Sequence, residues 1–377
     1  MGDEIEIEVF DKGLVRQGWI GNPSAFTVTP RHNMMSTGTI SMPGDHRMVP
    51  AVMAKGSRCV VKLNGDHVIS GPIRHRRGYG PLAKSMIVFE IQDDFRLLDR
   101  VLGWPAPGVP NPNTPGTFTQ AAAEYDVQTG PAETVLKGFV ARNVARLGLP
   151  VVVAQDQGRG LPITASARMH PLRDRLFPAV DQAGIGVTVQ QAESGLVVDC
   201  YVPVVRTQVL TEESGIVTDW EWSESPPSVT RVVVGGPGEA TARTFRLVRD
   251  QATETAWGDV IEQFRDARDA SSDAVMDARG WETIADGGHM YGLKLTLSDV
   301  GVWRYNRAFR VGDTVTHEIA PGASVTDVLR EARISFGDDT GLTVTPVVGD
   351  RSDDPSRDIA TVISALTKTT REIQAGR

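Results

Sequence analysis

Hydrophobic and polar positions alternate with a period of two over much of this chain, and helical spacing interrupts them in a few places. From Ile5 to about Phe95, short alternating runs are separated by turn residues, which is typical of a β-barrel or a β-sandwich. Here Asn64-Gly65 separates the runs RCVVKL and DHVISGPI and predicts a type I′ hairpin. The pattern predicts an N-terminal β-barrel domain over residues 1–102.

Prolines crowd the next part of the chain and argue against regular packed elements there. Between Gly103 and Gly116 the chain contains Pro105, Pro107, Pro110, Pro112 and Pro115. Because proline fixes φ and has no backbone donor, an extended crossover is expected over residues 103–130. A domain boundary is placed in this crossover.

The spacing of apolar residues predicts an α/β middle domain over residues 131–215. Pro131 opens a helical stretch, whose apolar face consists of Leu136, Val140, Val144 and Leu147. A second helical stretch is expected to kink at Pro178, and its apolar positions are Leu172, Leu176 and Val180. The run GIGVTVQQAESGLVVDCYVPV then predicts a β-hairpin that turns at residues 193–195.

Alternating runs return and predict a second β-barrel domain over residues 216–350. They include TRVVVGG, TARTFRLV, YGLKLTLSDVGVW and FRVGDTVTHEIA. A helical insertion is expected at about 252–286, with Trp257, Ile261 and Phe264 on one side and many charges on the other.

Residues 351–377 predict a C-terminal helix. Its apolar face consists of Ile359, Val362, Ile363, Leu366 and Ile373. Such a face needs a partner, either the helix's own domain or another subunit.

Composition is that of a folded protein with more than one domain. The chain has 377 residues, of which 40% are hydrophobic and 23% are charged. Its formal net charge of -8 argues against a protein whose main task is to hold nucleic-acid phosphates. The basic cluster Arg74, His75, Arg76 and Arg77 is interpreted as an exposed turn rather than a phosphate site, although partner binding stays open.

Two cysteines, Cys59 and Cys200, lie inside β-type runs and are expected to be buried thiols rather than a disulfide. The acidic start Met1-Gly2-Asp3-Glu4 does not have the pattern of a signal peptide, and no run approaches 18 apolar residues. We therefore expect a protein that is made in the cytoplasm and stays soluble until it meets a partner.

Glycine-rich and catalytic motifs were considered and give no site. Gly235, Gly236 and Gly238 follow a strand, but TARTFRLV alternates after them, so no helix N-terminus is expected to receive a pyrophosphate. The patterns GxxxxGK[ST], HExxH and GxSxG do not occur.

Titratable residues give no constellation either, so no catalytic, cofactor-binding or metal-binding residue is assigned. Histidines are scattered, at positions 32, 46, 67, 75, 170, 289 and 317. The acidic pairs are interpreted as solvated turn residues: Asp93-Asp94, Asp338-Asp339 and Asp353-Asp354. The run GDDTG offers oxygen ligands for calcium but does not have the full EF-hand spacing.

The order of several stretches along the chain carries a resemblance to one family. They are RQGWIGNPSAFTVTPRHN, TGTISMPGDHRMVPAVMAKGSRCVVKLNGDHVISGPI, EIQDDFRLLDRVLGWP, GPAETVLKGFVARNVARLGLP, LTEESGIVTDWEWSESPPSVTRVVVGGPGEATARTF and FRVGDTV. In this order they resemble the hub-type minor tail proteins of long-tailed bacteriophages, especially siphophages that infect actinobacteria. In that family a short helix ending in arginine precedes a proline-rich crossover, and Arg100 and Pro105 stand in those places.

The resemblance implies a mainly β fold with α+β parts. It comprises two related β-barrel domains, an α/β middle domain and a helical insertion, as in tail hubs. Glycine turns at Gly56 and Gly312, each just before a strand, are in keeping with two related domains but are too short to show a duplication.

By resemblance, the chain forms a homotrimeric ring whose six barrels match the sixfold tail tube or distal tail ring and the threefold tip. The implied partners are the distal tail ring protein, the tape-measure protein and tip or fibre proteins. DNA would be present only in transit through the channel, where acidic walls would repel it. The implied location is the virion, at the phage tail tip, with no cofactor and no membrane anchor.

Two other classes of function stay open beside this non-enzymatic one. A tail-associated enzyme that degrades cell wall or polysaccharide needs converging carboxylates or a metal, and no motif supplies them. A carbohydrate-binding adhesin needs an exposed aromatic platform. The candidate tryptophans are instead expected to be core or interface anchors: Trp19, Trp104, Trp220, Trp222 and Trp303.

Overall fold

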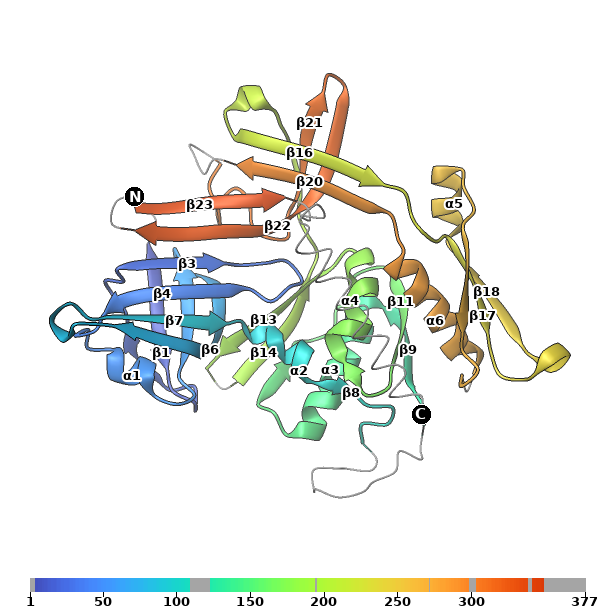
Figure 1. Cartoon of the computed structure of the whole chain (residues 1–377), viewed down its shortest axis with the longest axis horizontal. Helices are drawn as coiled ribbons and strands as arrows, with labels where there is room; N and C mark the ends of the chain where they lie inside the picture. Colours follow the sequence, from blue (N-terminus) through green and yellow to red (C-terminus); the bar gives the residue numbers. More distant parts are fainter. Residues whose placement is uncertain are drawn as a thin grey trace. The chain divides into compact units, whose positions relative to one another are not determined.

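The computed structural model describes residues 4–108, 123–193, 195–270, 272–297, 303–337 and 341–348. Its elements are mostly strands, drawn in Figure 1, which confirms the mainly β fold class. The chain separates into two compact units. Unit 1 contains residues 1–219 and 295–348, and the described part of residues 220–294 belongs to unit 2. Within the described ranges, no helix is long and apolar enough to cross a membrane.

The N-terminal part of unit 1 is a run of antiparallel strands in the order β3-β4-β7-β6-β5-β1-β2. Alternate side chains of these strands point into a buried apolar core, as the period of two predicts. The elements are β1 (Ile5–Phe10), β2 (Arg16–Trp19), β3 (Ala25–Thr29), β4 (Thr37–Pro43), α1 (Val49–Met53), β5 (Arg58–Leu63), β6 (Asp66–Tyr79), η1 (Leu82–Lys84) and β7 (Met86–Gln92).

The hairpin between β5 and β6 confirms the strongest local prediction. Asn64 and Gly65 have φ angles of 54° and 83°, and a type I′ turn requires positive φ at both positions. The strands pair from Leu63 with Asp66 onward, so the two-residue turn sets their register.

The sheet of the N-terminal part continues into strands from the far end of the chain. β22 pairs antiparallel with β3, and the rings of Phe26 and Phe336 stack with centroids 5.7 Å apart. The two β parts of unit 1 thus share one sheet, and the closure of each into a barrel stays a prediction. The later strands are β15 (Val205–Leu210), β16 (Val217–Ser225), β20 (Met290–Leu297), β21 (Thr314–Ala320), β22 (Ala323–Gly337) and β23 (Gly341–Val348), with η3 (Glu212–Ser214) after β15.

The middle of unit 1 contains both helices and strands, and the predicted division at residues 131–215 stays a prediction. Its elements are η2 (Asp94–Arg96), α2 (Leu97–Arg100), β8 (Leu102–Gly103), β9 (Asp126–Pro131), α3 (Ala132–Leu147), β10 (Val151–Val153), β11 (Pro162–Ala167), β12 (His170–Pro171), α4 (Leu172–Gln182), β13 (Gly186–Ala192) and β14 (Gly195–Tyr201). α2 ends at Arg100, as the resemblance implies. One difference is β9, which lies partly in the predicted crossover, because it pairs with β11 thirty or so residues later.

Two helices carry the core of this part. The predicted apolar face of α3 is buried except for Leu147, which lies in the last turn before Gly148 ends the helix at a φ of 61°. α4 buries Leu172, Leu176 and Val180 as predicted and contains Pro178 within its length. The hairpin of β13 and β14 is also confirmed.

Unit 2 contains a small sheet in the order β18-β17-β19 and two helices. The structure differs from the predicted helical insertion in one respect, which is that the strand β19 separates its helices. Gly258, with a φ of 64°, ends α5, and Phe264 then pairs with Val233 in a parallel ladder. The elements are β17 (Arg231–Gly235), η4 (Ala240–Ala242), β18 (Phe245–Arg249), α5 (Gln251–Trp257), β19 (Glu262–Asp266) and α6 (Asp273–Asp286).

Some predicted features lie outside the described residues. These are the C-terminal helix at 351–377, the acidic pairs at 338–339 and 353–354, the middle of the GDDTG run and part of the crossover.

Candidate functional site

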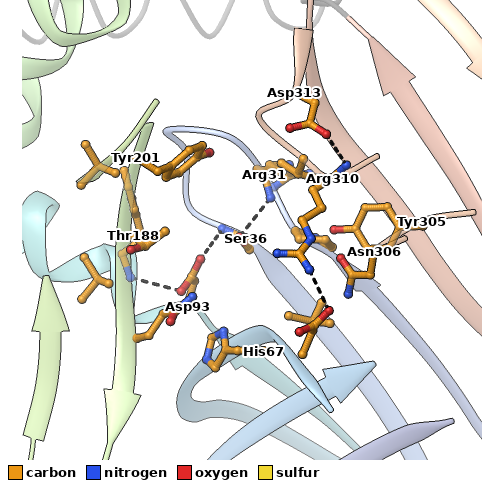
Figure 2. A pocket seen from close by; sticks show the side chains of 18 of the residues that line it. Arg31, Ser36, His67, Asp93, Thr188, Tyr201, Tyr305, Asn306, Arg310 and Asp313 are labelled. Carbon is orange, nitrogen blue, oxygen red and sulfur yellow. Dashed lines mark hydrogen bonds and ion pairs between the residues drawn. The ribbon is translucent and has the colours of Figure 1, made fainter. Parts of the chain in front are cut away.

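Unit 1 contains a cavity of about 510 Å³, and its wall comes from segments far apart in the sequence (Figure 2). One part of the wall is residues 30–36, the start of β6 and the residues after β7. β13 and β14 supply a second part, and residues 305–313 supply a third. The cavity therefore depends on the assembly of five stretches of the chain.

A buried acid of the cavity wall, Asp93, is held by backbone donors rather than by a cation. Asp93 accepts hydrogen bonds from the backbone N–H groups of Ser36 at 3.1 Å and Phe95 at 3.2 Å. Burial raises the pKa of this carboxyl to about 6, against an ordinary value of 3.8. Asp93 thus places a carboxylate without a cationic partner in the cavity wall at neutral pH.

The arginines at the cavity are already paired. Arg310 forms an ion pair with Asp66 at 3.1 Å. Arg31 forms one with Glu331 at 2.9 Å. Because these charges are matched locally, the cavity does not present a free cationic cluster for a phosphate.

Two hydrogen-bonding nitrogens of the wall have no partner within the described part of the chain. They are His67 Nε2 and Asn306 Nδ2, both buried. Burial lowers the pKa of His67 to about 4, so its ring is neutral at pH 7. The amide nitrogen of Asn306 favours a bound partner that supplies a hydrogen-bond acceptor, whereas Nε2 of the neutral His67 ring donates or accepts according to its tautomer, and leaving either group unsatisfied is unfavourable.

These groups suit binding better than catalysis. The Tyr201 hydroxyl lies 2.7 Å from His32 Nδ1, and burial raises the pKa of Tyr201, which keeps it protonated. The pKa of His32 is lowered to about 3 by burial, so His32 is a poor base at neutral pH. Within the described ranges, no group of three or more His, Cys, Asp or Glu residues could hold a metal ion.

Buried polar side chains fix the wall of the cavity. Asn33 donates to Asp181 at 2.6 Å and accepts from the backbone N–H of Val187 at 2.8 Å, which ties the turn after β3 to β13. Arg58 donates to Asp94 at 2.7 Å and to Gln191 at 2.7 Å. These contacts join the N-terminal β part to the α/β part.

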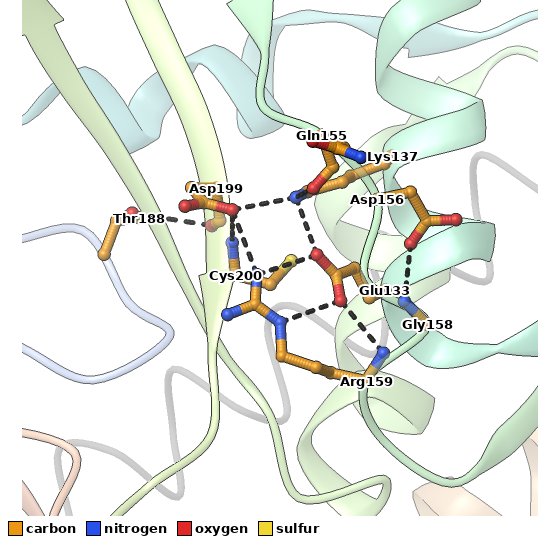
Figure 3. A network of polar contacts seen from close by, with 9 residues as sticks. All are labelled: Glu133, Lys137, Gln155, Asp156, Gly158, Arg159, Thr188, Asp199 and Cys200. Atoms are coloured by element: carbon orange, nitrogen blue, oxygen red, sulfur yellow. Dashed lines mark hydrogen bonds and ion pairs between the residues drawn. The ribbon is translucent and has the colours of Figure 1, made fainter.

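A second polar network lies inside the α/β part (Figure 3). Glu133 is fully buried in the first turn of α3, where it accepts from Lys137 Nζ at 2.6 Å and Arg159 Nε at 2.8 Å. Asp199 on β14 accepts from the same two cations at 2.8 and 3.1 Å. Hydrogen bonds from Arg159 hold the pKa of Glu133 well below its ordinary value. Two acids and two bases thus form a neutral network that joins α3 to β14.

The family model of the Siphovirus ReqiPepy6 Gp37-like protein matches residues 6–350. The chain belongs to this family. No curated protein matches it.

Three solved structures with a similar fold are described as tail proteins. The 43 kDa tail protein of prophage MuSo2 from Shewanella oneidensis has a TM-score of 0.54 at 15% identity, covering 92% of this chain and 98% of that one. Prophage tail protein gp18 from Listeria monocytogenes has a TM-score of 0.52 at 12% identity, with 97% and 99% covered. The tail protein from Neisseria meningitidis has a TM-score of 0.51 at 12% identity, with 92% and 97% covered. The predicted resemblance is confirmed: this is a siphophage family member with a tail-protein fold.

The structure corrects the interpretation of Asp93 and Asp94 as solvated turn acids. Both are buried, because Asp93 caps η2 and Asp94 pairs with Arg58. An acid directly before a helical turn is a capping signal, and it could have identified Asp93. The cavity itself has no sequence signal, since His67, Tyr201 and the other wall residues are brought together only by the fold.

The basic cluster lies within β6 and not in a turn. Arg74, His75 and Arg77 are exposed, whereas Arg76 donates to the Val52 carbonyl at 2.7 Å. The strand continues to Tyr79 because it pairs with β7 along this length. The turn of the hairpin follows the cluster, at residues 80–85.

The cysteine prediction is confirmed, since Cys59 and Cys200 are buried free thiols. Burial raises the pKa of Cys200 to about 12, so neither its position nor its ionisation suits nucleophilic chemistry. The glycines 235, 236 and 238 lead into the three-residue turn η4 and then into β18, so a strand follows them as predicted.

The tryptophans have different environments. Trp104 is buried beneath the guanidinium of Arg146, 4.5 Å from the ring centroid, and Trp303 stacks on Phe309 at 5.0 Å. Trp19 on β2 is half exposed, and the guanidinium of Arg47 lies 4.6 Å from its ring. In unit 2, Trp222 is partly exposed. The buried pair fits the prediction of core anchors.

Proposed function

We propose that this chain is a non-enzymatic structural protein of the phage tail tip, a hub that works as a homotrimer. It joins the sixfold distal tail ring or tube to the threefold tip and lines the channel that passes the tape-measure protein and DNA. The observation that carries the proposal is the family match over residues 6–350, together with a tail-protein fold that covers almost all of both compared chains.

The architecture of unit 1 supports a load-carrying role. One sheet runs from the N-terminal strands into β22 and β23, so the beginning and the end of unit 1 are hydrogen-bonded to each other. Buried polar contacts of Asn33 and Arg58 fix the α/β part against that sheet. Such bracing raises the free energy of local opening in unit 1, which suits a part that carries load between neighbours.

The character of the cavity supports binding rather than turnover. Its arginines are paired, its histidine His67 is neutral and its two tyrosines are protonated, so it offers shape and hydrogen-bonding groups but no activated nucleophile. The acidic net charge of the chain suits a channel that DNA crosses without sticking.

Immunogold labelling of intact virions of the encoding phage tests this placement. We expect antibody raised against the chain to label only the end of the tail distal to the capsid. On the same virions, a control antibody against the tube protein is expected to label the whole length of the tail. Label from this chain along the tube or on the capsid would contradict the proposal.

A further inference from the structure

The hairpin of β6 and β7 carries the most exposed large apolar side chain among the described residues. Leu82 in its turn is 90% exposed, and Tyr79 beside it is 55% exposed. Monomeric surfaces expose single apolar residues commonly, but two such residues on a projecting turn form a protrusion that suits insertion into a partner.

The flanks of this turn are cationic. Arg74, Arg77 and Lys84 are exposed, and none of them forms an ion pair with another described residue. Residues 74–84 contain no acid, although the whole chain has a net charge of -8. The net charge of the other residues is therefore more negative than -8, so the hairpin is opposite in charge to the rest of its own chain.

The cavity in unit 1 has the complementary features. Val202 and Val204 line it and are about half exposed, which gives it an apolar mouth. Among the described residues, Asp93 in its wall has no cationic partner, and the buried nitrogens of His67 and Asn306 have no hydrogen-bond partner. An apolar side chain, a cation and backbone carbonyls would satisfy these groups together.

The hairpin turn cannot reach the cavity of its own chain. Asp66 and His67, which line the cavity, begin β6, whereas Tyr79 ends it. Thirteen residue steps at about 3.3 Å each give β6 a length of at most roughly 40 Å, and the seven steps along β7 from Met86 to Asp93 place the turn roughly 20 Å from the cavity wall. A contact between them has to join two copies.

We propose that the β6–β7 hairpin turn of one copy, led by Leu82, docks at the Val202–Val204 mouth of the cavity in a second copy. This contact rests on the proposed function, since it would be the joint between neighbouring copies in the hub. It joins two different surfaces, and such head-to-tail contacts close into rings when the rotation between copies permits.

Cross-linking between two cysteine variants tests the contact directly. Full-length chain carrying Leu82→Cys is mixed with chain carrying Val204→Cys, exchanged by dilution and reconcentration, and treated with a short bis-maleimide. We expect a covalent dimer from this mixture, while Leu82→Cys mixed with Leu161→Cys gives none. Leu161 is the matched control, because it is 65% exposed and lies elsewhere in unit 1.

Self-association measured by sedimentation velocity gives a second readout. We expect Leu82→Asp to weaken association roughly tenfold or more, since a charge replaces a leucine that the proposed contact would bury, while Leu161→Asp changes it little. An intact oligomer without the cross-link overturns the contact and leaves the hub proposal standing. A chain that stays monomeric both alone and with the distal tail ring protein overturns both. Leu82-dependent binding to anionic phosphatidylglycerol vesicles, without an effect on self-association, assigns the hairpin to a membrane surface and also overturns the contact.

Discussion

Replacing Glu133 by glutamine removes the negative charge at the centre of the buried network in Figure 3. The side chain keeps its shape, but Lys137, which is almost fully buried, loses its 2.6 Å ion pair. Breaking a buried ion pair by removing one partner destabilises a protein by about 3–5 kcal/mol. Because Asp199 still neutralises Lys137 at 2.8 Å, we expect a smaller loss of about 2–4 kcal/mol.

Hydrogen–deuterium exchange of peptides from α3 measures this loss where it occurs. A loss of about 2–4 kcal/mol in the free energy of opening makes the slowest amides of α3 exchange roughly 30 to 700 times faster. Peptides from β17 in unit 2 are expected to stay unchanged. The matched control is Glu90→Gln, an exposed position on β7, which we expect to shift stability by less than about 0.5 kcal/mol.

Equal exchange rates of α3 in the two variants would contradict a stabilising role for Glu133. If α3 exchanges at the same rate in Glu133→Gln as in Glu90→Gln, the charge of Glu133 contributes no net stability.

In the unmodified protein the folded-state pKa of Glu133 is depressed. The stabilisation by Glu133 is therefore present above pH 4.5, its ordinary pKa, and is lost as the pH falls below that value. The glutamine variant is expected to lose this acid-induced change in α3.

Three further substitutions have expected outcomes. Asp93→Asn removes an acid whose folded-state pKa is raised to about 6 from an ordinary value of 3.8. With aspartate the free energy of unfolding falls as the pH rises from 3.8 to 6, and urea titrations of the asparagine variant should lack this fall. Gly280→Ala gains helix propensity but places a Cβ 2.5 Å from Val248, so a net loss of about 1 kcal/mol is expected in exchange of α6; a gain would contradict this packing. Gly65→Ala meets no neighbour but has a φ of 83°, and thermal unfolding should show a loss of about 1 kcal/mol, with no loss if the turn is not type I′.

Local patterns predicted the parts of the fold that depend on local geometry. The Asn64-Gly65 turn, the buried faces of α3 and α4 and the burial of both cysteines follow from spacing and turn chemistry over a few residues. β19 was taken for helix because Trp257, Ile261 and Phe264 also fit a helical face. Its pairing with β17, thirty residues away, decided against that pattern.

Long-range contacts explain what the sequence did not show. Asp94 is buried because Arg58 lies beside it in the fold, and β3 joins β22 across about three hundred residues. The cavity combines His67, Tyr201 and Asn306 from three separate stretches. No short motif predicts that these residues lie close together, since each one alone is an ordinary member of a strand or turn.

The solution mass of the purified chain is the most direct test of the hub proposal. Light scattering would be recorded over a range of concentrations, with and without the distal tail ring protein of the same phage. We expect a mass of about three chains, or a ring of three copies that forms on the tail ring protein. A monomer at every concentration that ignores the tail ring protein and cleaves or binds glycans would contradict the proposal.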